Sequence, residues 1–423
     1  MLTGFNNHHS SEAIDGALPK HQNSPQRTPY GLYAEQITGT AFTAPKPDNR
    51  RTWVYRRRPS VLHQANRQSI ELANWVAGRL QTPVEPMRWS PMDLPAGDFA
   101  HSLRLVTRCG GPLQHAGAAS LIFNTQGQSS SLQNHDGEMA LIPVNGSLTV
   151  VTELGEFELD PGHVGVIPRG LIFHLTSAAP VYGYALENYG APLTLPERGP
   201  VGANCLANER DFEYPQARLQ AEQPTRIIVK SDNQFTQFDL DHTPYDVAAW
   251  HGNLAPYRYD LRRFNTLGSI SYDHPDPSIF TVLTSPSAVP GTANIDLVVF
   301  NERWLVADET FRPPWYHRNV MSEFMGLVLG QYDAKPEGFV PGGCSLHNAG
   351  APHGPDHQAY SHAVSSDLAP TRLNDTLAFM FETGLRQQVP QAMMDTPALQ
   401  PSYPECWNGL APVSLETLLG AKE

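Results

Sequence analysis

The feature that most limits the fold of this chain is the abundance of residues that interrupt regular backbone. The 423 residues include 38 prolines and 33 glycines. Proline removes a backbone donor and ends helices, and glycine allows the tight reversals that connect short segments. This pattern is typical of β proteins with many turns, and it is unlike that of helical bundles. We expect helices only over residues 69–80, SIELANWVAGRL, and over 414–422, SLETLLGAK.

Charge and cysteine usage restrict the classes of partner. With 29 basic and 42 acidic residues, the formal net charge is −13, and there is no long basic stretch. Nucleic acids and anionic membrane surfaces are therefore not expected as partners. No apolar run approaches the length of a membrane span, and the N-terminus does not read as a secretory signal. The four cysteines are widely scattered without CxxC spacing, so we expect no disulfides, no zinc thiolates and a reduced, cytoplasmic setting.

A strand pattern begins after Gly137. Over residues 138–177, apolar and polar residues alternate in short runs, which is the pattern of half-buried strands. Asn145-Gly146, Leu154-Gly155 and Pro161-Gly162 predict hairpin turns between these runs. We interpret the segment as one half of a double-sheet antiparallel barrel of the jelly-roll or cupin type.

A second strand-rich block spans about residues 267–385. Its predicted strands are SIFTVLTS (278–285), IDLVVF (295–300), EFMGLVLG (323–330) and LAFMFET (377–383). Two such blocks predict a mainly β, bicupin-like fold with two cupin or jelly-roll barrels, a loop-rich N-terminal arm and few short helices. The predicted parts are an arm with strands and a short helix that packs on the first barrel (1–135), a first barrel without a metal (136–190), a linking region (191–266) and a C-terminal catalytic barrel (267–423).

Three residues of the second block carry the expected chemistry. His317 and Glu323 lie in RPPWYHRNVMSEFMG, and His353 lies in SLHNAGAPHGPD. Two imidazoles and one carboxylate are the ligand set of mononuclear non-haem iron(II) sites, which leave one face of the metal open. A straight strand would place His317 and Glu323 about 20 Å apart, and a helix would place them on different faces. Residues 318–322 must therefore form a tight loop that returns Glu323 to His317.

The residues alone leave other interpretations open. A given histidine in a chain with 17 of them is more often a hydrogen-bonded surface residue than a metal ligand. The spacing also differs from the HxH pattern that generic cupins prefer. A zinc hydrolase that uses the same three ligands and an activated water is one alternative. A non-catalytic double-barrel protein of the storage or sugar-binding kind is another.

Longer motifs narrow the choice. RPPWYHRNVMSEFMG and YDHPDPSIFTVLTSPS resemble segments of the homogentisate 1,2-dioxygenase family, the ring-cleaving enzymes of tyrosine and phenylalanine breakdown. QNSPQRTPYGLYAEQITGTAFT, RRTWVYRRRPS, GANCLANERDF and AAWHGNLAPYRYDLRRFN resemble the same family, so that only about residues 61–130 match poorly. The resemblance implies Fe(II)-dependent cleavage of homogentisate by O2 to 4-maleylacetoacetate. It also implies a homo-oligomer, either a trimer or a dimer of trimers.

The resemblance assigns the metal ligands. It implies that His317, Glu323 and His353 bind Fe(II), and that His353 also contacts the substrate. Three neighbours are candidates for supporting roles. His347 lies six residues before His353 and could orient a ligand or the substrate from behind. Arg318 and Asn319 adjoin a ligand, and they pair either with the substrate carboxylate or with their own loop.

The resemblance also assigns two residues to the substrate. It implies that His274, in YDHPDPSIF, is the acid/base histidine, and that Tyr332, in GQYDAK, contacts the substrate hydroxyl. Taken alone, His274 would more often stabilise its loop by a hydrogen bond, and Tyr332 would more often pack on a core. The adjacent Asp273 is expected to raise the basicity of His274 and to hold its orientation.

Overall fold

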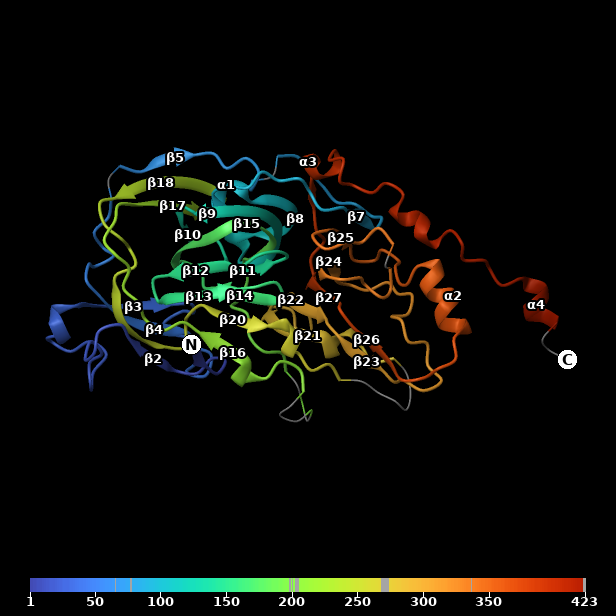
Figure 1. Ribbon diagram of the computed structural model, residues 1–423, viewed down its shortest axis with the longest axis horizontal. Helices are drawn as coiled ribbons and strands as arrows, with labels where there is room; N and C mark the ends of the chain where they lie inside the picture. Colours follow the sequence, from blue (N-terminus) through green and yellow to red (C-terminus); the bar gives the residue numbers. More distant parts are fainter. Residues whose placement is uncertain are drawn as a thin grey trace.

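The protein is described here by a computed structural model, which covers residues 1–420 apart from positions 65, 77, 198, 200, 202–204, 268–273 and 336. Strands and loops dominate these residues. Figure 1 shows an elongated molecule with a large N-terminal β unit, a smaller C-terminal β unit beside it, and a C-terminal tail that extends beyond the second unit. The α-helices of the described chain are short: α1 (Phe99–Ser102), α2 (His357–Ser365), α3 (Gln391–Met394) and α4 (Leu415–Gly420). The predicted mainly β class with few short helices is confirmed.

The first unit contains the largest sheet. Its main path runs β1 (Leu2–Thr3), β16 (Phe212–Tyr214), β20 (Tyr257–Asp260), β14 (His163–Ile167), β11 (Glu138–Pro143), β15 (Ile172–Asn188), β10 (Ser131–Asn134), β17 (Thr225–Ser231), β18 (Gln234–Leu240) and β5 (Gln68–Ile70). The strands that branch from it are β12 (Leu148–Thr152), β13 (Gly155–Leu159), β9 (Ala116–Gln128) and β8 (Arg104–Gly111). A smaller sheet has the order β2 (His9–Glu12), β19 (Val247–Gly252), β4 (Arg51–Arg56) and β3 (Tyr33–Thr38).

Strand β15 pairs with several strands of this unit, because it is 17 residues long and changes one of its partners where its pairing is irregular, between Ser177 and Val181. Before that point it pairs with β12, and after it with β11. All six residues of β11 are buried, as expected for a strand with neighbours on both edges and packing on both faces.

Only one of the three predicted turns closes a hairpin. Leu154-Gly155 joins β12 and β13, which pair with each other. The strands beside Asn145-Gly146, β11 and β12, instead pair with β14, β13 and β15, so this hairpin prediction is wrong. The turn Pro161-Gly162 leads from β13 to β14, which pairs with β11 and β20. A turn sequence reverses the chain locally, whereas burial decides which strand becomes the partner.

The predicted helix over 69–80 is also wrong. The chain there leaves β5, passes through turns and enters β6 (Leu80–Gln81), with no helix among the described residues of the segment. Leu72 and Trp75, two apolar residues of the predicted helix, lie in turns and are both buried. Pairing of β5 with β18 and of β6 with β28 (Val389–Pro390) replaces the helical hydrogen bonds, an override of local propensity by tertiary contacts. The tail helix is confirmed as α4.

The second unit is a six-stranded sheet. Its order is β21 (Thr281–Pro286), β22 (Ala293–Phe300), β27 (Leu377–Thr383), β24 (Ser322–Leu329), β25 (Cys344–His347) and β7 (Met87–Trp89). Three predicted strands are confirmed as β22, β24 and β27. The fourth differs because Pro277 starts a 3-10 turn, Pro277–Phe280, and the strand begins only at Thr281. A separate two-stranded ladder pairs β23 (Arg303–Leu305) with β26 (Thr371–Leu373).

The N-terminal segment takes part in both units, since β7 extends the C-terminal sheet. The buried Tyr184 of β15 joins the units from the other side: its hydroxyl lies 2.6 Å from the carbonyl oxygen of Gly343. Strands on both sides of the predicted boundaries at 135/136 and 190/191 share the large sheet, and the four-part division stays a prediction.

A buried ion cluster fixes the first unit. The ammonium of Lys230 is fully buried, and it lies 2.5 Å from Asp136 and 2.6 Å from Glu187.

All four cysteines are free. Within the described residues, none of the helices combines the length and the apolar character needed to traverse a bilayer.

Candidate metal centre and substrate cavity

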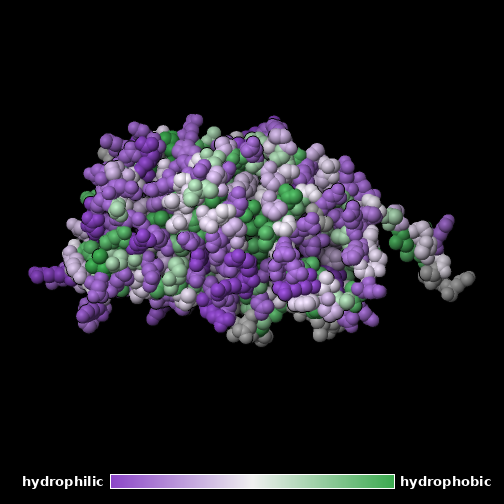
Figure 2. All heavy atoms as spheres, viewed as in Figure 1, coloured by the Kyte–Doolittle hydropathy of each residue, from purple (hydrophilic) through white to green (hydrophobic). Residues whose placement is uncertain are grey.

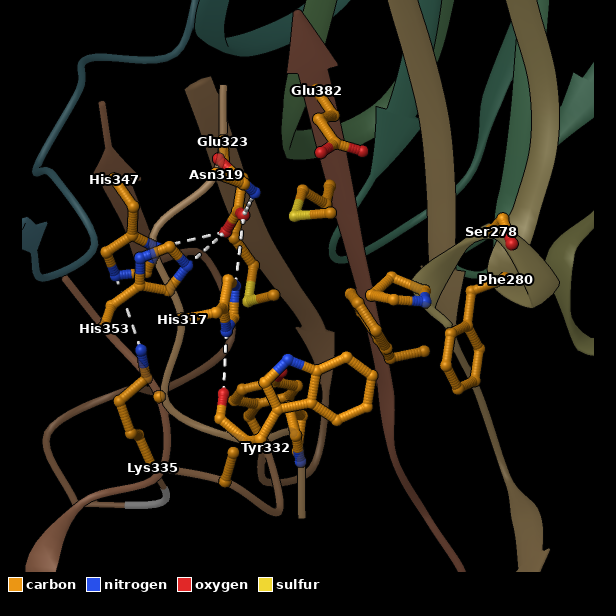
Figure 3. A pocket seen from close by; sticks show the side chains of 18 of the residues that line it. Ser278, Phe280, His317, Asn319, Glu323, Tyr332, Lys335, His347, His353 and Glu382 are labelled. Carbon is orange, nitrogen blue, oxygen red and sulfur yellow. Dashed lines mark hydrogen bonds and ion pairs between the residues drawn. The ribbon is translucent and has the colours of Figure 1, made fainter. Parts of the chain in front are cut away.

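The predicted ligands meet at one edge of a cavity in the C-terminal unit. Nε2 of His353 lies 3.0 Å from Oε2 of Glu323, and Nε2 of His317 lies 3.7 Å from Oε1 of the same carboxylate. One donor atom from each of the three residues falls within 4.8 Å of the others. Figure 3 shows the two imidazoles turned toward Glu323. The side chains are therefore close enough to share one cation.

The tight loop predicted between His317 and Glu323 is confirmed. Glu323 is the second residue of β24, and the chain before it forms a short irregular loop. The loop is held to the segment of His353 by an isolated backbone bridge: the His317 amide donates to the His353 carbonyl at 2.9 Å, and the His353 amide donates back at 3.1 Å. Gly354 permits this approach, because a Cβ there would lie 2.7 Å from the Tyr316 ring.

Backbone carbonyls select the ring nitrogen that each histidine presents. Nδ1 of His317 lies 2.7 Å from the carbonyl oxygen of Trp315, and Nδ1 of His353 lies 2.9 Å from that of Ala351. Each Nδ1 therefore carries the proton that it donates, and Nε2, which faces Glu323, is the nitrogen that binds a metal once any proton on it is released. A donor set of two such nitrogens and a carboxylate fits iron(II) and is also compatible with zinc.

Glu323 is anionic despite its burial. Burial alone would raise its pKa, but the close contacts of its oxygens with His317, His347 and His353 hold the pKa of this carboxyl well below its usual range. The same contact with Glu323 raises the pKa of His317.

His347 contacts two of the candidate ligands, Glu323 and His353. It is the cross-strand partner of Glu323 in the β24–β25 pair, and its Nδ1 lies 3.5 Å from Oε2 of Glu323. Its ring stacks on that of His353 at 4.3 Å. The hydroxyl of Tyr403 lies 2.8 Å from its Nε2. Burial, followed by the charge of Lys335, holds the pKa of His347 well below its ordinary value, so the ring is neutral.

Asn319 and Arg318 have different surroundings in the structure. The Asn319 amide donates to Oε1 of Glu323 at 2.8 Å, and its oxygen accepts the backbone amide of Met321 at 3.1 Å. Asn319 thus supports the ligand carboxylate and its own loop. Arg318 is exposed and lines the cavity.

The cavity measures about 430 Å³, a size suited to a small aromatic molecule. His274 lines it, half-buried, with its Nδ1 2.7 Å from the carbonyl oxygen of Pro275. Burial lowers the pKa of His274. The imidazole is therefore neutral near pH 7, and the carbonyl of Pro275 holds a proton on Nδ1. Asp273 lies outside the described residues, so its expected effect on the basicity of His274 stays a prediction.

Tyr332 packs in the core and also borders the cavity. It is 6% exposed and packs in an edge-on manner against Phe300 and Phe339. It also lines the cavity, and its contact with a substrate hydroxyl stays a prediction. Burial raises its pKa, which keeps the hydroxyl protonated.

Two acidic residues and one lysine of the cavity were not foreseen. Glu382 on β27 is the cross-strand partner of Glu323, and Asp296 on β22 is the partner of Glu382. Burial, with Glu323 and Asp296 nearby, raises the pKa of Glu382 to about 8. Lys335 is 5% exposed and lies 3.4 Å from Nε2 of His347. Only the strand register could have indicated the acidic pair, whereas Lys335 stands in the GQYDAK motif already noted for Tyr332.

Comparison with known families decides the affiliation of the chain. The family model described as homogentisate 1,2-dioxygenase N-terminal matches residues 1–261, and the one described as homogentisate 1,2-dioxygenase C-terminal matches residues 262–413. The chain belongs to the homogentisate 1,2-dioxygenase family. The expectation drawn from the sequence motifs is thereby confirmed.

Similar curated proteins agree. The homogentisate 1,2-dioxygenases of Nitrobacter hamburgensis and Rhodopseudomonas palustris are each 51% identical over 418 residues, which cover 97% of this chain and 93% of the relative. That of Rhizobium meliloti is 48% identical over 421 residues, with the same coverage. Homogentisate dioxygenases therefore align with both units of the chain, including the segment of the sequence that resembles the family poorly.

Among solved structures, the similarities are distant. The Escherichia coli protein Ylba has a TM-score of 0.30 at 9% identity, covering 73% of this chain and 94% of its own. A cupin 2 conserved barrel domain protein from Leptotrichia buccalis has a TM-score of 0.27 at 11% identity, covering 68% and 89%. Scores this low carry no argument about function.

Proposed function

We propose that this member of the family cleaves the ring of homogentisate with O2, and that Fe(II) held by His317, Glu323 and His353 is its cofactor. The observation that carries the proposal is the convergence of the three donor atoms within 4.8 Å at the wall of a cavity of about 430 Å³. A zinc hydrolase or a storage protein would not be expected in a chain that matches a dioxygenase family over both of its units.

Bound Fe(II) would supply a redox-active Lewis acid with open positions for the substrate hydroxyl and dioxygen. The chain contributes the donors. Glu323 offers a negative charge that balances the cation, and the two Nε2 atoms are oriented by the carbonyls behind their rings. Because Glu323 belongs to a central strand, the carboxylate has a rigid support.

His274 and Tyr332 act on the substrate in this proposal. The neutral His274, whose Nδ1 is engaged with the carbonyl of Pro275, lines the cavity and takes the proton of a substrate hydroxyl in this proposal. Tyr332 stays protonated and donates a hydrogen bond to a substrate oxygen. Phe280 and Phe300 form an apolar part of the cavity wall, against which the aromatic ring of the substrate would pack. The product, 4-maleylacetoacetate, retains both oxygen atoms of O2, so no external reductant is needed.

We also propose a homo-oligomer, a trimer or a dimer of trimers, in the cytoplasm. The tail helix α4 supports assembly, because Leu415, Leu418 and Leu419 are all more than half exposed on a segment that projects from the body. The face of the body seen in Figure 2 is mostly hydrophilic, whereas apolar groups occur along that tail. The free state of all four cysteines supports a reducing compartment.

The test is anaerobic reconstitution with Fe(II), followed by an oxygen-electrode assay on homogentisate and on gentisate. We expect one O2 consumed per homogentisate and little uptake with gentisate, whose carboxylate lacks the methylene spacer. The control is Glu323→Ala, which should lose both iron and oxygen uptake. An iron-replete wild-type protein that consumes no oxygen with homogentisate would contradict the proposal, and oxygen uptake supported equally by Zn(II) would contradict the assignment of Fe(II) as the cofactor.

A further inference from the structure

We propose that Lys335 is the anion-binding residue of the cavity, and that it takes the carboxylate of the substrate side chain. This inference rests on the proposed function, because it assigns a partner to one group of the proposed substrate. The notable feature is a lysine that is 5% exposed and lines the cavity beside the metal centre.

The ammonium of Lys335 lacks a strong acceptor among the described residues. Its hydrogen-bond partner there is Nε2 of His347, at a long 3.4 Å. That nitrogen has a single lone pair, which the hydroxyl of Tyr403 already approaches at 2.8 Å. The other neighbours are the faces of Tyr403 and Trp407, with the ammonium 5.7 Å and 5.6 Å from the ring centroids. Aromatic faces attract a cation but do not accept its hydrogen bonds as an anion would.

A buried ammonium without an anion is unfavourable, so this position is prepared for one. Lys230 in the first unit provides the contrast, because that equally buried lysine contacts two carboxylates. No carboxylate lies within ion-pair distance of Lys335 in the part of the chain that the structure describes. Glu323 pairs with His347 in the strand register, but its ion-pair partners are imidazoles and do not include Lys335.

The charges of the sheet also fix the direction of a bound acid. Across β25, β24, β27 and β22, the residues in register are His347, Glu323, Glu382 and Asp296. Lys335 stands at the His347 end of this row, and the two unassigned acids stand at the opposite end. A substrate carboxylate is attracted to the lysine, whereas the acidic end, where Glu382 with its raised pKa is largely protonated, offers it no cation.

The chemistry of a 2,5-dihydroxyphenylacetate fits this arrangement. Its acetate group and one hydroxyl are on adjacent ring carbons, so both groups must face the same wall. The ring of His347, which Lys335 contacts, stacks on the ligand His353 at 4.3 Å. A hydroxyl at the metal centre therefore places the neighbouring acetate on the Lys335 side. The exposed Arg318 also lines the cavity, but solvent weakens its charge interactions.

The test compares Lys335→Met and Lys335→Arg with wild type, using homogentisate and methylhydroquinone, which has a methyl group in place of the acetate. Dissociation constants are measured by anaerobic calorimetry on Fe(II)-loaded protein. Lys335→Met should weaken homogentisate binding about 10- to 100-fold, the range for hydrogen bonds to charged groups. Methylhydroquinone binding and iron content should stay within about threefold, and Lys335→Arg should restore part of the homogentisate affinity. Arg318→Met, the matched cavity variant, should have the smaller effect on homogentisate.

Three results would overturn the inference. Equal weakening of both ligands, or loss of iron in Lys335→Met, would mean that the lysine only supports His347 and Glu323. Unchanged homogentisate affinity in a folded Lys335→Met protein would mean that the carboxylate binds elsewhere. A larger loss in Arg318→Met would identify the arginine as its partner. Failure of the proposed function looks different, because wild-type protein would then neither bind nor oxidise homogentisate.

Discussion

Replacing Asn319 by leucine should weaken Fe(II) binding without removing a ligand. The amide of Asn319 donates to Oε1 of Glu323 at 2.8 Å, and Glu323 is only 6% exposed, so water does not replace the lost donor easily. A hydrogen bond to a charged group contributes about 1.5–3 kcal/mol. This corresponds to about a 10- to 100-fold loss in Fe(II) affinity, in line with the usual effect of residues that hold ligand carboxylates.

The assay is anaerobic competition for Fe(II) between the protein and a chelator of known affinity. Asn374→Leu, a change at an exposed asparagine of the same unit, is the matched control and should bind as wild type. Affinity of Asn319→Leu within threefold of wild type would refute the reasoning. The measurement also separates the two roles considered for Asn319, since pairing with the substrate carboxylate predicts a raised KM with intact iron affinity.

Three further outcomes are expected. His274→Asn should keep near-normal iron content and lose about 10²- to 10⁴-fold in turnover, measured with the oxygen electrode; wild-type turnover would exclude the proposed base. Because burial lowers the pKa of His274, the neutral form persists below pH 6.5, and kcat/KM should fall only as pH drops through that lowered value; an acid limb above pH 6.5 would contradict this assignment. Lys230→Met should lower the free energy of unfolding by about 3–5 kcal/mol in urea titrations, because Asp136 and Glu187 stay buried without their cation; a loss below 1 kcal/mol would show that the cluster relaxes.

The local sequence predicted the sheet strands better than their partners. The runs that became β22, β24 and β27 are apolar and bounded by turn residues, and their positions agree with the structure. The predicted helix over 69–80 failed because its apolar residues, including Leu72 and Trp75, are equally well buried by turns between two short strands. Such a choice depends on β18 and β28, which are distant in the sequence.

The convergence of the three candidate ligands could be predicted because geometry restricted it. Regular strand or helix cannot bring His317 and Glu323 to one ion, so a loop was required, and the structure has one. The surroundings could not be predicted in the same way. Glu382 becomes the neighbour of Glu323 only through the register of two strands that are over fifty residues apart in the chain. Lys335 gains its significance from burial, which a local motif does not reveal.

The backbone bridge between His317 and His353 has a mechanical consequence. Two reciprocal hydrogen bonds lock these loops into one piece, so the spacing of the paired imidazoles is preserved when the loops shift. Glu323 instead belongs to a central strand of the sheet. A displacement of either loop would therefore move both imidazole nitrogens together relative to the carboxylate.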